Sequence, residues 1–254
     1  MAVFLLHIKK EKKMNTREIK FEEKNFILTI RNDSPVVITV PHDGTLPKQY
    51  LRGMFAERTQ DVDRDIRIGR DKHVFPIVKD ISLNARVNVV YAMVHRAYID
   101  FNRPPEIGVE DKNLIDVYNY YHTTVTKLVS WCKNKYGYCL LLDLHGCANL
   151  TKPGMENVDI ILGTNNRKSV FSNIDIKLEQ WLIDHEYAVL VADDEIFQGI
   201  FTGRYNVIDY AERFHVDSIL IEITSRYRVK GAESLGMILA NDIAEFIRVY
   251  INQR

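Results

Sequence analysis

Two histidines and one glutamate stand at or near the ends of apolar runs in this sequence. His42 follows the run PVVITV, His145 follows YCLLLDL, and Glu222 lies inside DSILIEI, where an isolated carboxylate is costly to bury unless it is paired, protonated or near a cation. Two histidines and a carboxylate can hold zinc and leave a position open for water, and a further carboxylate can act as general base. With an arginine to hold a substrate carboxylate, these residue types indicate a metallohydrolase for amide bonds in amino-acid-like molecules.

The third metal ligand and the substrate anchor have to come from other segments. TQDVDRDIR offers Asp61 and Asp63, although its alternating charges, taken alone, are more typical of a solvated helix face. Asn102 and Arg103 follow an apolar segment and precede two prolines. The guanidinium of an arginine forms a fork that suits a carboxylate, while a surface arginine is the simpler interpretation of Arg103 alone.

The segments around these residues predict the elements that position them. Helical spacing of apolar residues predicts a long helix over 114–137, a C-terminal helix over 235–250 and a less regular one within 168–185. Strands alternating with helices predict an α/β sandwich with a mostly parallel or mixed sheet, whose strand ends can converge on one crevice. Because no linker or repeat divides the chain, residues 1–254 are expected to form one domain. Apolar, β-branched runs typical of covered strands occur at 35–40, 88–94, 138–144, 158–163, 187–192 and 217–223.

The composition favours a small-molecule partner. The chain has 34 Lys+Arg and 34 Asp+Glu, so no overall field favours nucleic acid or an anionic membrane. Its three cysteines include no Cys-x-x-Cys pair, which disfavours a disulfide framework and fits the cytoplasm. No run reaches the roughly 20 apolar residues of a membrane span. The first residues make a poor signal peptide, and Met14 is a possible start that would leave residues 1–13 as a disordered extension.

Seven short motifs follow one another along the chain. They are Pro41-His42-Asp43-Gly44, Asp61-Val62-Asp63, Arg96-x-x-Ile99-Asp100-Phe101-Asn102-Arg103-Pro104, Tyr121-His122, Leu142-Asp143-Leu144-His145, Leu162-Gly163-Thr164 and Ile221-Glu222. As an ordered set they resemble the N-formylglutamate amidohydrolase family, which is related to the zinc carboxypeptidases and aspartoacylases. The resemblance implies a three-layer α/β/α sandwich with a central mixed sheet, a zinc-carboxypeptidase-like fold, and one zinc ion.

The resemblance also implies roles for the residues that match the metal site and the base. His42 and His145 match the histidine ligands, and Asp63 matches the carboxylate ligand, with Asp61 as the alternative. Glu222 matches the general base, which would take the proton of the zinc-bound water and later protonate the departing nitrogen.

A second group of matching residues would bind the substrate. Asn102 and Arg103 resemble the pair that grips a substrate carboxylate, and Arg103 is also counted as catalytic. Arg96 is a second anchor or a polariser of the scissile carbonyl. The implied substrate is an N-acyl amino acid, by family default N-formyl, as in N-formylglutamate.

The chain departs from the family pattern at three places, which leaves the substrate open. Asp43 stands where the family has a small residue, Gly146 where it has a serine, and Arg204 within a segment where it has paired glycines. Asp43 and Arg204 would add charge near the cleft, so Arg204 is a candidate for substrate binding and Asp43 for substrate preference. The alternatives are a zinc peptidase or amidase for cell-wall or γ-glutamyl peptides and a catalytically silent binding homologue. Retention of Glu222 with both histidines favours an enzyme.

Overall fold

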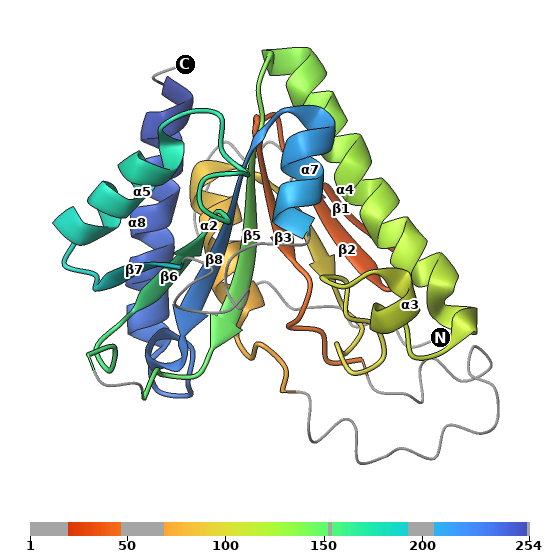
Figure 1. Ribbon diagram of the computed structural model, residues 1–254, viewed down its shortest axis with the longest axis horizontal. Helices are drawn as coiled ribbons and strands as arrows, with labels where there is room; N and C mark the ends of the chain where they lie inside the picture. The colour runs from red at the N-terminus through yellow and green to blue at the C-terminus, as the bar shows by residue number, and fades with distance from the viewer. Residues whose placement is uncertain (1–19, 47–68, 152–153, 193–205, 253–254) are drawn as a thin grey trace, which may run out of the picture.

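A mixed sheet of eight strands forms the centre of the computed structural model, which describes residues 20–46, 69–151, 154–192 and 206–252 (Figure 1). The strand order is β1-β2-β4-β3-β5-β8-β6-β7. The strands are β1 (Lys20–Lys24), β2 (Ile27–Arg31), β3 (Val36–Val40), β4 (Asn88–Ala92), β5 (Leu140–Cys147), β6 (Ile160–Gly163), β7 (Val189–Ala192) and β8 (Asp217–Thr224). The four central strands β4, β3, β5 and β8 are parallel, so their carboxyl ends lie at one edge of the sheet.

Helices cover both faces of the sheet (Figure 1). One face packs against α2 (Val74–Ala85), α5 (Ile174–Asp184) and α8 (Glu233–Asn252), and the other against α4 (Ile115–Tyr136) and α7 (Asn206–Phe214). The short elements are α3 (Pro105–Gly108), η2 (Lys112–Leu114) and η3 (Ser225–Tyr227). The three-layer α/β/α sandwich with a mixed sheet is therefore confirmed. In the part of the chain that is described, no helix has the length and apolarity to cross a membrane.

The apolar patterns located most of these elements. All six predicted strands are present, and the stripe on α4 is buried as far as Cys132. Gly137 ends α4 with a φ of 78°, a left-handed conformation that suits glycine. The helix predicted within 168–185 begins only at Ile174 because Asp217 accepts the backbone N–H groups of Phe171 and Ser172 and holds that segment as a turn.

Several elements were not predicted from the sequence, among them β1, β2, α2 and α7. Strand β1 has the polar sequence KFEEK, and β2 pairs with it across a turn at Asn25 and Phe26 in which both residues have positive φ. Helix α2 carries Pro76 in its first turn, where proline is tolerated because the N–H group there has no helical partner. A proline inside an apolar run hides such a helix from a periodicity argument.

The chain leaves β3 through a tight passage that fixes the start of α2. A Cβ atom on Gly44 would lie 2.1 Å from the Val94 carbonyl oxygen, so only glycine fits there. The Asp43 carboxylate accepts the backbone N–H groups of His73 (3.1 Å) and Phe75 (2.8 Å) at the first turn of α2. Asp43 therefore caps α2 and anchors the segment before it, and its effect on substrate preference stays a prediction.

Candidate metal centre and active site

Three buried side chains meet at the carboxyl edge of the central strands. His42 follows β3, His145 lies near the end of β5, and Asp71 precedes α2. Their potential ligand atoms all lie within 4.8 Å of one another. The Asp71 Oδ2 atom is 3.0 Å from His145 Nδ1 and 3.5 Å from His42 Nδ1. Both imidazoles thus turn the same nitrogen toward one carboxylate.

The other nitrogen of each imidazole faces a second carboxylate. His42 Nε2 is 2.7 Å from Asp100 Oδ1, and His145 Nε2 is 3.1 Å from Asp143 Oδ2. Thr39 donates a hydrogen bond of 2.6 Å to the other oxygen of Asp143. A carboxylate on the outer nitrogen is the usual way to fix the ring and tautomer of a metal-binding histidine. Both rings are therefore oriented with Nδ1 toward the centre of the cluster.

The cluster fits a metal ion. The Nδ1 atom of His42 is buried and has no hydrogen-bond partner among the described residues, an arrangement that is costly unless something else occupies its lone pair. Two imidazole nitrogens and a carboxylate oxygen are a donor set that zinc accepts, with a fourth position left open. His42, Asp71 and His145 could therefore hold one metal ion.

The charges in the cluster are strongly coupled. Burial alone would raise the pKa of Asp71, but its close contacts with the imidazoles of His145 and His42 hold it far below its usual range. Asp100 is also held well below its usual pKa, against the effect of burial, by His42 and Arg96. Burial would lower the pKa of His145, but Asp143 and Asp71 raise it well above its ordinary value. Without a metal, this site therefore retains a proton that a metal ion has to displace.

Glu222 lies on β8 directly beside the histidine of β5. It is the register partner of His145 and is only 8% exposed. Burial raises the pKa of Glu222 to about 7, with the cationic His145 opposing that rise and the Asp71 carboxylate adding to it. A carboxylate with a pKa near neutrality can both accept and return a proton at physiological pH.

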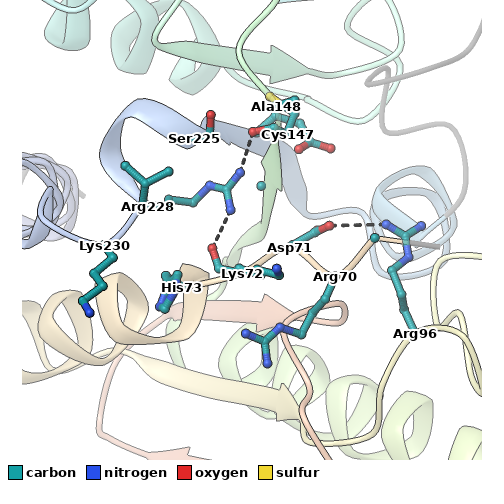
Figure 2. Close-up of a pocket in the computed structure, with 14 residues that line it drawn as sticks. Arg70, Asp71, Lys72, His73, Arg96, Cys147, Ala148, Ser225, Arg228 and Lys230 are labelled. Atoms are coloured by element: carbon teal, nitrogen blue, oxygen red, sulfur yellow. Dashed lines mark hydrogen bonds and ion pairs between the residues drawn. The ribbon is translucent and has the colours of Figure 1, made fainter. Parts of the chain in front are cut away.

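A cavity of about 620 Å³ opens beside Glu222 and Asp71 (Figure 2). Arg96 bridges the Asp71 Oδ1 atom (3.3 Å) and the Asp100 Oδ2 atom (3.1 Å) from one side of it. The cationic side chains that line the cavity are Arg70, Lys72, Arg96, Arg228 and Lys230. Since the carboxylates in the lining are Asp71 and Glu222 alone, the described lining is suited to an anionic substrate.

Comparison with known proteins identifies the family of the chain. The sequence model of the N-formylglutamate amidohydrolase family matches residues 34–113 and 109–227, most of the chain. The chain belongs to this family. No curated protein sequence matches the chain.

Solved structures share the fold of this family member at low sequence identity. The crystal structure of N-formylglutamate amidohydrolase from Ralstonia eutropha JMP134 is 19% identical with a TM-score of 0.66, covering 90% of this chain and 100% of that one. The gene product Atu2144 from Agrobacterium tumefaciens is 14% identical with a TM-score of 0.60, covering 85% and 90%. Both likenesses support the α/β/α fold, and at these identities they show the fold alone.

The family motif residues expected to bind substrate occupy three different places. The Asn102 Nδ2 atom lies 2.8 Å from His145 Nε2 and 3.1 Å from Asp143 Oδ2, on the outer side of the cluster of His42, Asp71 and His145. Arg103 is exposed and lines a separate hollow of about 440 Å³ with Tyr118 and His122. Of the expected substrate residues that the structure describes, Arg96 is the one that lines the cavity of Glu222. Asp61, Asp63 and Arg204 lie outside the described residues.

Sequence reasoning assigned no role to three carboxylates that the fold brings to the histidines. Asp143 stands two residues before His145 on a strand, and this spacing alone places both side chains on one face. Asp100 was part of a quoted motif, but its partner His42 is distant in the sequence. Asp71 gave no local signal, because the helix it precedes was not predicted.

Proposed function

We propose that the chain is a zinc-dependent hydrolase of the amide bond in an N-acyl amino acid, with an N-formyl amino acid such as N-formylglutamate as the first candidate. The observation that carries the proposal is the cluster of His42, Asp71 and His145, whose Asp71 lines a cationic cavity together with the buried Glu222. Membership of the N-formylglutamate amidohydrolase family supports an amidohydrolase.

His42, Asp71 and His145 are the residues that would hold the metal. We assign to Asp71 the ligand role that the sequence suggested for Asp63, because the Asp71 carboxylate contacts His145 Nδ1, whereas Asp63 lies outside the described residues. A zinc ion bound there would supply a Lewis acid and lower the pKa of a water molecule toward 7. Asp100 and Asp143 would keep both rings turned toward it.

Glu222 would move the proton. Its carboxylate takes a proton from the attacking water as the new C–O bond forms at the acyl carbon. It returns that proton to the amide nitrogen as the C–N bond breaks, which releases the amino acid and the carboxylic acid. The pKa of about 7 suits both halves of this cycle, because the group is neither too weak a base nor too weak an acid.

Cationic side chains would bind the substrate and its developing charge. Arg96 lines the cavity of Glu222 and is fixed by Asp71 and Asp100. We therefore assign it the role of stabilising the negative charge that develops on the acyl oxygen. Arg103 lines the separate hollow, and its contact with a substrate carboxylate remains a prediction. Arg103→Met is then expected to raise KM, whereas Arg96→Met is expected to lower kcat.

The test is hydrolysis by the purified protein before and after removal of its metal. We expect zinc after mild purification, release of free amino acid from N-formylglutamate, loss of activity with EDTA and recovery with zinc. N-acetyl and N-succinyl amino acids and short γ-glutamyl peptides complete the substrate panel. Release of amino acid from the peptides alone would reject the N-acyl amino acid in favour of a peptidase. Zinc binding without hydrolysis of any member would indicate a silent homologue.

A further inference from the structure

Arg228 is a buried arginine in the wall of the cavity that the proposed chemistry does not use. It follows the short helix η3 and is only 8% exposed. A buried guanidinium is costly, and an apolar side chain could fill the same volume. An arginine at this position is therefore explained only if the groups around it need the several hydrogen-bond donors of a guanidinium.

The guanidinium donates to three backbone carbonyls, each within two residues of a residue of the proposed site. Figure 2 shows the bonds to Lys72 and Cys147. Nε donates to Ile223, which follows Glu222, at 2.8 Å. Nη1 donates to Lys72, which follows Asp71, and Nη2 donates to Cys147, two residues after His145. One planar group thus connects three chain segments that are remote from one another in the sequence.

Gly146 makes room for this group. A Cβ atom on Gly146 would lie 2.3 Å from the Arg228 Cζ atom and 2.5 Å from Nη1, closer than real carbon contacts allow. The backbone of Gly146 has no positive φ, so the need for glycine here is one of space. The glycine at a position where the sequence pattern leads one to expect serine is therefore explained by the arginine that lies against it.

We propose that Arg228, accommodated by Gly146, is a positioning residue that holds the segments of Asp71, His145 and Glu222 in register around the metal centre. The proposal rests on the proposed metal site, but it concerns the geometry of that site and not its substrate. The planar fork matters because its donors point to carbonyls on different sides. A single ammonium group cannot reach all three.

The test uses Co²⁺ as the probe, because its visible absorption reports the geometry of its ligands and needs no substrate. We expect Arg228→Met to weaken Co²⁺ binding, measured against a competing chelator, by about tenfold or more, and to shift the visible bands. Arg226→Met is the matched control, since Arg226 lies on η3 with its side chain 58% exposed and pairs with Asp159. Arg226→Met should leave the Co²⁺ affinity and the visible bands unchanged. Arg228→Lys should bring both closer to the native values than Arg228→Met does, but not all the way.

Space at Gly146 gives an independent check. Gly146→Ala should weaken Co²⁺ binding in the native background and have little effect in Arg228→Met, because the flexible methionine leaves room for the added methyl group. If Arg228→Met does not fold, Gly146→Ala alone decides. Native affinity and bands in Arg228→Met or Gly146→Ala, or full rescue by Arg228→Lys, would overturn the proposal. If the native protein binds no Co²⁺, the metal centre itself is refuted, which is a different outcome.

Discussion

Glu222→Gln should make the metal-free protein more stable and the zinc-loaded protein almost inactive. Glu222 is nearly isosteric with glutamine, but glutamine carries no charge and cannot accept the proton. Burial raises the pKa of Glu222 from 4.5 to about 7 in the folded chain, a difference of about 2.5 pH units that corresponds to roughly 3 kcal/mol.

The sign of the effect follows from proton binding. Between pH 4.5 and pH 7 the folded protein binds more protons at Glu222 than the unfolded chain does, so the free energy of unfolding falls as pH rises through this window. It then stays low above pH 7. Integrating between pH 5 and pH 8 gives a loss of roughly 2.5 kcal/mol in the free energy of unfolding of the native protein. The Glu222→Gln variant should not show this loss.

The assay is urea denaturation of metal-free native protein and Glu222→Gln at pH 5 and pH 8. We expect the variant to gain much more stability over the native protein at pH 8 than at pH 5. Glu245→Gln, at an exposed position on α8, is the control and should show no such pH dependence. With zinc, kcat of Glu222→Gln should fall by two to four orders of magnitude. An equal stability difference at the two pH values, or an unchanged kcat, would refute the assignment of Glu222 as a buried base.

Three further predictions concern the metal centre and its support. Asp71→Ala should abolish stoichiometric zinc binding in a metal analysis, whereas Asp63→Ala should retain it; the reverse result would restore Asp63 as the ligand. Zinc binding should release a proton from the site, because Asp143 and Asp71 raise the pKa of His145. Calorimetry in two buffers of different ionisation enthalpy should therefore show proton release and an affinity that falls as pH falls, and identical heats would contradict this. Asp43→Ala should cost about 2 kcal/mol in urea denaturation through loss of the α2 cap, while Asp43→Asn, which keeps an acceptor, should cost less; equal losses would argue against capping.

Local sequence patterns were sufficient for most of the architecture. Strands covered on both faces and a helix with one apolar stripe are specified by their own residues, so six strands, α4 and α8 could be predicted. Polar β1 and proline-containing α2 could not be predicted this way, because the first is stabilised by its pairing with β2 and the second by the cap from Asp43.

The sequence by itself also determined that His42, His145 and Glu222 lie together, since strand ends in a parallel sheet meet at one edge. Only the tertiary structure decided which side chains complete the site. Asp71 reaches His145 because Asp43, far away in sequence, anchors the start of α2. Such contacts join segments 30 residues apart or more, and the identity of a residue carries no information about its distant partner. For the same physical reason, only the tertiary structure explains the glycine at position 146, because the Arg228 guanidinium fills the space that a side chain would take there.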